Sequence, residues 1–134
     1  MKNIKAITSQ TLVSQVTADK LDNILTEKIF NIIDVRDQAA IKDQGDIPGS
    51  INIPFEMIDS SMDPDHEDYH TVFEENKPIL FCCTGGVMSY TAALKAGKKG
   101  IQDLHNLEGG HAAWLNFKLN QSVQETALAD NSIS

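Results

Sequence analysis

The sequence lacks a long hydrophobic run, a surplus of positive charge and more than two cysteines. Its longest uninterrupted apolar run, from Ile79 to Cys83, has five residues, far short of the roughly 20 that a membrane-spanning helix needs. Lys and Arg number 11 against 19 Asp and Glu, so the formal net charge is -8. The basic surface stripe that is typical of nucleic-acid-binding proteins is therefore not expected. Neither a membrane nor a nucleic acid is predicted as a partner.

The two cysteines, Cys82 and Cys83, are adjacent and so cannot staple distant segments together. This usage is typical of a reducing compartment. Polar residues from Thr8 to Thr11 stand where a secretory signal would need an apolar segment. We therefore expect a cytoplasmic protein.

The 134 residues, 41 % of them hydrophobic and 22 % charged, are enough for one globular domain. We expect this domain to span residues 1–118. The polar remainder, residues 119–134, is expected to form a flexible C-terminal tail.

Negative charge is concentrated between Glu56 and Glu75, where eight acidic residues occur without a Lys or Arg. A solvated surface is the ordinary interpretation of such a block, and an acidic rim that faces a protein partner is the alternative. His66 and His70 have a spacing that could hold a metal, but no further ligand pattern surrounds them. No metal and no cofactor is predicted.

Short apolar stretches that favour strands alternate with segments that favour helices. We expect strands within residues 31–35, 51–54, 78–82 and 101–107, and helices within residues 17–25, 90–99 and beyond Gly110. Tyr69, Val72 and Phe73 are spaced as one face of a further helix. This alternation indicates an α/β fold with a largely parallel sheet.

Cys83 lies where a predicted strand ends, and a loop with Gly85 and Gly86 follows it before the next helix. A helix N-terminus and convergent backbone N–H groups both stabilise a thiolate, so Cys83 is predicted to be a nucleophile. Cys82, within the apolar strand, is predicted to be buried.

The choice of nucleophile decides the chemistry. Counted from Cys82, five residues precede Met88, which is the spacing of a phosphatase-type loop whose arginine has been replaced. Phosphate recognition favours a bidentate guanidinium, which Met88 does not supply. Counted from Cys83, the loop to Met88 is shorter and suits a sulfur carried on the cysteine as a persulfide.

Four motifs occur in one order: Asp34-Val35-Arg36, then Gly45 to Pro54, then Cys83 to Ser89, then Leu107 to Trp114. Together they resemble a single-domain rhodanese over roughly residues 17 to 118. The resemblance implies a three-layer α/β/α domain with a central, mainly parallel five-stranded sheet.

The resemblance also implies a sulfurtransferase activity. Cys83 would take a sulfane sulfur from thiosulfate or a persulfide donor, hold it as a persulfide, and pass it to cyanide or a thiol. The implied substrate-binding residues are Thr84, Gly85, Gly86, Val87, Met88 and Ser89. Asp34 and Arg36 would support the site, either by facing the substrate or as a buried or half-buried ion pair that orders the loops at the strand ends.

Two positions depart from the motifs of many relatives. Met88 stands where an arginine is common, and Asp46 replaces a common histidine, while Arg36 is the only arginine of the chain. We therefore expect weak activity with thiosulfate or a less charged donor. The alternatives are a binding or regulatory module with feeble catalysis, and a thiol redox sensor in which Cys82 and Cys83 form a disulfide.

Overall fold

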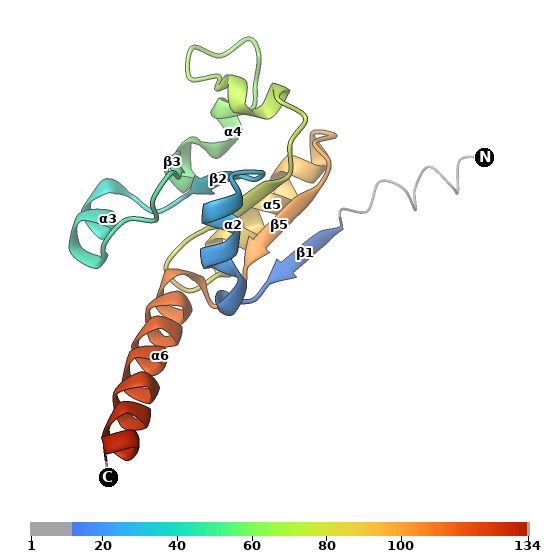
Figure 1. Cartoon of the computed structure of the whole chain (residues 1–134). Coiled ribbons are helices and arrows are strands. Elements are labelled where there is room, and N and C mark those ends of the chain that lie inside the picture. Colours follow the sequence, from blue (N-terminus) through green and yellow to red (C-terminus); the bar gives the residue numbers. More distant parts are fainter. Residues whose placement is uncertain (1–11, 134) are drawn as a thin grey trace.

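The computed structural model describes residues 12–133, and its centre is a five-stranded sheet (Figure 1). The strands lie in the order β1-β5-β4-β2-β3, and every neighbouring pair is parallel. Their bounds are β1 Val13–Val16, β2 Asn31–Asp34, β3 Ile51–Asn52, β4 Ile79–Cys82 and β5 Leu104–Leu107. The predicted α/β fold with a parallel sheet is thus confirmed.

The inner strands are continuous apolar runs because both of their faces are covered. Along β4 all four residues are buried, and alternate side chains enter different cores. Ile79, Phe81 and the following Cys83 belong to one hydrophobic cluster. Leu80 and Cys82 belong to the other. Strand β4 is therefore the shared wall of the two cores.

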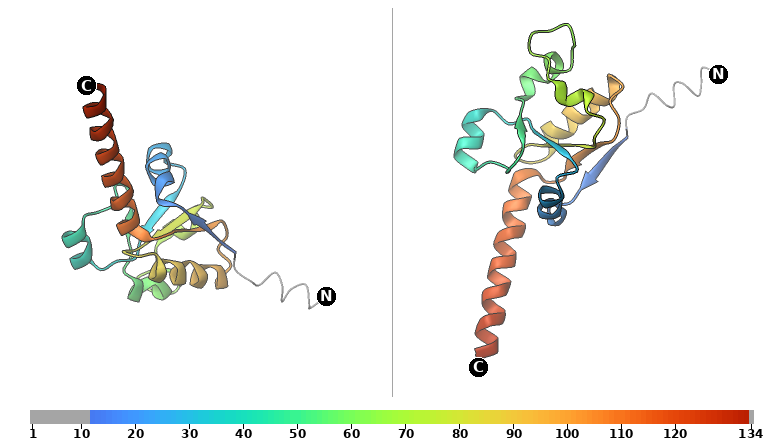
Figure 2. Two further views of the ribbon diagram at one scale, coloured as in Figure 1. Left: turned by 90° about the horizontal axis from the view of Figure 1, so that it is seen from below. Right: turned by 45° about the horizontal axis from the view of Figure 1, so that its top comes forward.

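Helices cover the two faces and make a three-layer arrangement (Figure 2). On one face, α5 (Val87–Lys98) packs through Ala92, Ala93 and Ala96, and α4 (Ile58–Ser61) packs through Ile58. On the other face, α2 (Leu21–Glu27) contributes Leu21 and Ile24 beside Trp114 of α6 (Gly110–Ile133). The three small alanines let the α5 backbone approach the sheet closely, which places its first turn beside the end of β4.

Three of the predicted helices differ from the structure, two of them in where they begin and one in its type. The segment after Thr17 starts as a 3-10 turn, η1 (Ala18–Lys20), and the Thr17 side chain makes no capping hydrogen bond. The stretch with Tyr69, Val72 and Phe73 holds only the 3-10 turn η3 (Thr71–Glu74). Helix α5 begins at Val87, three residues before the predicted start, because the loop after Cys83 is short. A third 3-10 turn, η2, spans Phe55–Met57.

The C-terminal segment, for which the sequence predicted a flexible tail, is helical, because α6 continues to Ile133. Residues 119–133 contain no proline or glycine and several good helix formers, so nothing local ends the helix. Residues 118–125 are all exposed, and the helix extends away from the sheet (Figure 1). None of the helices within residues 12–133 has the length and apolar composition needed to cross a bilayer.

Candidate active site

Three chain segments meet at one edge of the sheet because parallel strands all end on the same side. Residues 34–36 close β2, Cys83 follows β4, and Gly109 and Gly110 link β5 to α6. This edge therefore gathers three of the four sequence motifs, and the fourth joins it through Gly45 and Asn52.

The sulfur of Cys83 is the point on which the hydrogen bonds of this edge converge. The N–H groups of Gly86 and Ser89 donate to it at 3.1 and 3.3 Å. The Ser89 hydroxyl oxygen lies 3.1 Å from it. Cys83 itself is 4 % exposed. The first turn of α5 thus presents two backbone donors to a nearly buried thiol, which is the arrangement that stabilises an anion at this position.

Two glycines are required to build the loop around Cys83. Gly86 has a φ of +92°, and a Cβ there would lie 2.8 Å from the Gly109 nitrogen. A Cβ on Gly110 would lie only 2.4 Å from the Thr84 oxygen. This close approach lets the N–H groups of His111 and Ala112 donate to the carbonyls of Cys83 and Thr84 at 2.8 and 3.0 Å. The start of α6 therefore fixes the backbone of the loop from outside.

Asn106 ties this loop to the sheet, although sequence reasoning did not select it. It is 1 % exposed on β5, accepts a hydrogen bond from the Ser89 hydroxyl at 2.6 Å and donates to the Gly86 carbonyl at 3.0 Å. It also donates to Gln15 on β1 at 3.0 Å. The available signal was an asparagine in a predicted strand, because a buried polar side chain needs hydrogen-bond partners.

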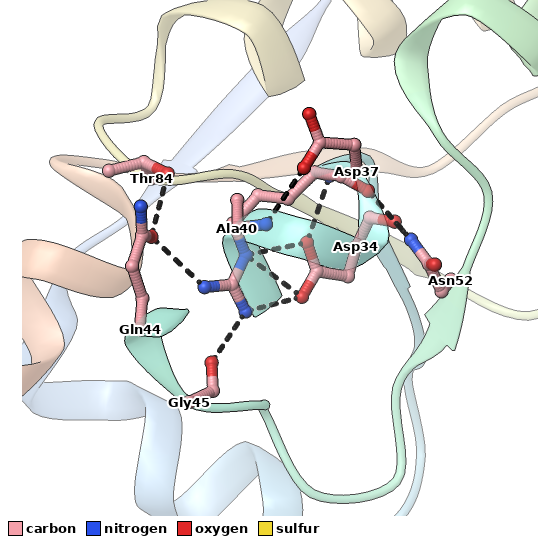
Figure 3. Close-up of polar contacts among 8 residues, drawn as sticks. Asp34, Asp37, Ala40, Gln44, Gly45, Asn52 and Thr84 are labelled. Carbon is pink, nitrogen blue, oxygen red and sulfur yellow. Dashed lines mark hydrogen bonds and ion pairs between the residues drawn. The ribbon is translucent and has the colours of Figure 1, made fainter. Parts of the chain in front are cut away.

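Arg36 is held in the ion pair with Asp34 that the sequence predicted (Figure 3). Its Nη2 lies 2.7 Å from Asp34 Oδ2, and both side chains are buried. Its remaining donors bond to the Gly45 carbonyl at 3.0 Å and to Gln44 at 3.2 Å. On the other side of the pair, Asn52 donates to the carbonyls of Asp34 and Arg36 at 2.9 and 2.8 Å. Each of the three guanidinium nitrogens thus donates to the protein at least once, with one bond from Nη1 and two from Nη2.

A pocket of about 550 Å³ opens in front of Cys83. Its wall is mostly apolar or uncharged, with Val87 78 % and Met88 45 % exposed at the mouth. The charged residues of the wall are Arg36 and Asp37, and the full lining is Arg36, Asp37, Ala40, Cys83, Thr84, Gly85, Val87, Met88 and Thr91. Among the described residues that line this pocket, the only cation is therefore one that is already paired.

The predicted substrate-binding residues fall into two groups. Thr84, Gly85, Val87 and Met88 line the pocket with Cys83. Gly86 and Ser89 are buried behind it and contact the sulfur. Asp46, which we considered as a source of repulsion for an anionic donor, is exposed and does not line the pocket.

Cys82 points away from this pocket. It is fully buried in the cluster that contains Leu80 and Trp114, as predicted. Burial, followed by the nearby Asp34 carboxylate, raises the pKa of its thiol well above the usual range. A phosphatase-type loop that uses Cys82 is therefore wrong for this geometry, because its sulfur does not face the loop. Because Cys82 and Cys83 pack into different clusters, a disulfide between them would require local rearrangement.

The histidines play structural parts. His66 and His70 each accept a backbone N–H, from Asp68 and Val72. His111 is 2 % exposed beside Trp114, and burial, followed by Arg36, lowers its pKa. Within residues 12–133, no three His, Cys, Asp or Glu side chains are grouped so that they could hold a metal ion.

The acidic segment reaches the site only at its first residue. A smaller cavity of about 230 Å³ is lined by Glu56, Phe55 and Pro54 and shares Asp37 and Met88 with the pocket of Cys83. Farther along, Asp59 pairs with Lys95 at 3.1 Å, and Tyr69 donates to Glu74. Negative charge therefore borders the mouth of the pocket at Asp37 and Glu56.

Comparison with known proteins places this geometry in a family. The profile described as Rhodanese-like domain matches residues 17–117. The chain is 31 % identical over 116 residues to the thiosulfate sulfurtransferase/rhodanese-like domain-containing protein 3 of Mus musculus, covering 83 % of this chain and 74 % of the mouse protein. It is 26 % identical to the thiosulfate:glutathione sulfurtransferase of Homo sapiens, covering 75 % and 91 % of the two chains.

A solved structure from Rhodopseudomonas palustris superimposes with a TM-score of 0.75 and 29 % sequence identity, covering 79 % of this chain and 82 % of that one. That protein is described as one of unknown function and as a possible tyrosine phosphatase. The match supports the three-layer architecture described above.

Proposed function

The chain belongs to the rhodanese-like domain family, and from this premise we propose that it is a sulfurtransferase that carries sulfane sulfur as a persulfide on Cys83. The observation that carries the proposal is the convergence of the Gly86 and Ser89 N–H groups on the Cys83 sulfur in the wall of a pocket. The names of the mouse and human relatives, both sulfurtransferases, support it.

The proposed reaction has two displacement steps at sulfur. The Cys83 thiolate attacks the sulfane sulfur of the donor, a Cys83 S–S bond forms, and the donor leaves with the electron pair of the broken bond, as sulfite from thiosulfate or a thiolate from an organic persulfide. A thiolate or cyanide then attacks the outer sulfur, and the Cys83 thiolate leaves. The acceptor departs as a persulfide or as thiocyanate. Two covalent half-reactions of this kind give ping-pong kinetics.

The loop supplies backbone donors for the anions of both steps. The Gly86 and Ser89 N–H groups already contact the inner sulfur. The carbonyls of Cys83 and Thr84 point outward, where they accept the N–H groups of α6. Such preorganised dipoles cost no reorganisation when charge develops on sulfur.

We propose that the donor carries little negative charge near its reacting sulfur. The Arg36 guanidinium is committed to Asp34, Gln44 and Gly45, and Met88 at the mouth is uncharged. Asp37 and Glu56 border the opening. A thiosulfate dianion would approach these carboxylates without a free guanidinium to offset them. The same rim would suit a protein partner that presents its sulfur among basic residues, at the acidic surface of residues 56–75.

The test is mass spectrometry of the intact full chain and of its peptides after incubation with sulfur donors. The variants are the natural sequence, Cys83→Ser and, as the matched control, Cys82→Ser. The donors are thiosulfate, glutathione persulfide and cysteamine persulfide, which carries an ammonium group. We expect a mass gain of one sulfur atom that only Cys83→Ser abolishes and that cyanide removes, formed fastest with cysteamine persulfide.

If none of the donors adds sulfur to Cys83, the sulfurtransferase proposal is wrong. A binding or regulatory module would then be favoured, because a pocket without a free cation and with a partner-facing acidic rim suits recognition as well. A loss of two hydrogens under mild oxidation, in place of sulfur addition, would instead indicate the redox pair of Cys82 and Cys83.

A further inference from the structure

The Asn106 side chain is held in one orientation. Its amide nitrogen donates to the Gly86 carbonyl and to the Gln15 side chain, both at 3.0 Å. A backbone carbonyl can only accept, so the Nδ2 group must face Gly86. The amide oxygen is then the atom that faces Ser89, at 2.6 Å.

This orientation decides where the single proton of the Ser89 hydroxyl lies. The Asn106 oxygen carries no proton, so Ser89 must donate to it. The Ser89 oxygen lies 3.1 Å from the Cys83 sulfur, and on that side it has only lone pairs to offer. Along this contact the Cys83 S–H therefore donates and the Ser89 oxygen accepts.

We propose that Asn106 is a positioning residue which, by accepting the hydrogen bond of the Ser89 hydroxyl, makes Ser89 an acceptor for the Cys83 S–H, so that this hydroxyl opposes ionisation of the nucleophile until it turns. The inference deepens the proposed function and rests on it only for the consequence that sulfur transfer is gated. The orientation of the hydroxyl rests on geometry alone.

Two opposed sets of contacts then act on one sulfur. The N–H groups of Gly86 and Ser89 favour the thiolate, whereas the Ser89 oxygen favours the thiol. When the proton leaves, a Ser89 lone pair faces the negative sulfur, and the hydroxyl can donate to it only by giving up Asn106. Asn106 is buried, so its amide oxygen would lose its hydrogen-bond donor without gaining one from water, which costs free energy. The Ser89 oxygen thus opposes the two N–H donors for as long as its hydroxyl faces Asn106.

The charged and titratable groups around Cys83 are outside this network. Arg36 and Asp37 line the pocket, and Asp34 is paired with Arg36. His111 donates its backbone N–H to the Cys83 carbonyl, and Cys82 is the adjacent residue of the chain. These groups are the same in all of the variants compared below. The network behind the sulfur consists of the uncharged Ser89, Asn106 and Gln15. Substitutions within the network therefore leave the nearby charges in place.

The test is the pH dependence of Cys83 alkylation by iodoacetamide in the full chain, followed by peptide fragmentation that distinguishes Cys83 from Cys82. Removing an acceptor of the S–H frees the thiol to ionise, so Ser89→Ala is expected to shift the alkylation midpoint to lower pH by roughly half a unit to one unit. A hydroxyl that donated to the thiolate would give the opposite shift. The sign of the shift therefore decides the question.

A second variant keeps the proposal testable if Ser89→Ala does not fold. Asn106→Leu removes the competing acceptor and frees the Ser89 hydroxyl to donate to the thiolate, so its midpoint also moves to lower pH. His105→Gln is the matched control, because His105 is the neighbouring residue on β5 and pairs with Asp103 instead. Its midpoint should equal that of the natural sequence. Far-UV circular dichroism identifies which variants are folded.

A shift to higher pH in either folded variant overturns the proposal, as does an unchanged midpoint. This readout requires no sulfur donor, so it is independent of the sulfur-addition experiment. A downward shift without any sulfur adduct would support the gated thiol and refute the sulfurtransferase. A sulfur adduct with an upward shift would do the reverse.

Discussion

The side-chain oxygen of Gln44 accepts two hydrogen bonds that join the ion pair to the cysteine loop. Arg36 donates to it from Nη1 at 3.2 Å, and Thr84 donates to it from its hydroxyl at 2.9 Å (Figure 3). Gln44 is the last residue of α3 (Gln38–Gln44). Helix α3 is therefore connected to the residue that follows Cys83 through one amide oxygen.

Replacing Gln44 should loosen the loop more than it destabilises the fold. Gln44→Leu removes both contacts. The bond from Arg36 is part-buried, and its loss costs about 1 kcal/mol, whereas the bond from Thr84 is exposed and its loss costs less. We expect the rate of sulfur addition to Cys83 to fall several-fold, with a modest drop in the midpoint of urea unfolding. Gln38→Leu, at the exposed start of the same helix, is the control. Equal rates in the two variants would contradict a positioning role for Gln44.

Two glycines with positive φ should respond very differently to alanine. Gly110 has a φ of +67° and meets the Thr84 and Cys83 carbonyl oxygens, whereas Gly100 has a φ of +92° and no atom within 4 Å of an added Cβ. Gly100→Ala should cost only the left-handed strain, about 1 kcal/mol. Gly110→Ala should cost several times more, because the backbone of the loop must move. Urea unfolding measures both, and equal losses would show that contact with the loop is unimportant.

A guanidinium at the mouth of the pocket should change the preference for the donor. Met88 lines the pocket and is 45 % exposed, so Met88→Arg adds an unpaired cation near Cys83. We expect KM for thiosulfate to fall by about tenfold, which corresponds to one charge-assisted hydrogen bond of about 1.4 kcal/mol. Met88→Leu preserves the volume without the charge and should leave KM unchanged. The prediction is wrong if the arginine and leucine variants have the same KM.

His111 should make stability depend on pH. Its pKa is lowered by burial and then by Arg36, with Asp34 and Asp46 acting in the opposite direction. The folded state therefore binds a proton less readily than the unfolded chain, whose histidines titrate at about 6.5. The free energy of unfolding should fall as the pH drops below this value, because only the unfolded state gains the proton.

The His111→Gln variant isolates this contribution. The carboxylates titrate in both proteins, so their effects cancel in the difference between the two unfolding free energies. That difference should shrink as the pH is lowered from about 7.5 to about 5.5. A difference that does not change with pH would show that His111 binds protons equally in the folded and unfolded states.

Sequence reasoning predicted the inner strands because strands buried on both faces consist of continuous apolar runs. β1 was not predicted, since two of its four residues are polar and exposed and its pairing is with β5, far along the chain. Helix α3 was not predicted either. It buries no residue, so no apolar periodicity marks it, and the Asp37 side chain caps it by accepting from the Ala40 N–H.

The site divides in the same way between local and distant contributions. Cys83 and its glycines could be predicted because strand, loop and helix are consecutive in the sequence. Asn106, Gln15 and Gln44 could not, because their partners come from other strands and helices. Gln15 and Asn106 are neighbours only because β1 lies beside β5. Polar residues in predicted strands indicate a buried hydrogen-bond network, but the order of the strands in the sheet decides which residues it joins.

The position of β5 and α6 has a consequence for the chain as it is synthesised. β1 can pair only after β5 has been synthesised. The carbonyls of Cys83 and Thr84 likewise find their donors only when His111 and Ala112 are present. A nascent chain that has emerged only as far as Gly100 already exposes its cysteine, but neither the sheet edge nor the loop can close. The loop around Cys83 can therefore close only after β5 and the start of α6 have left the ribosome.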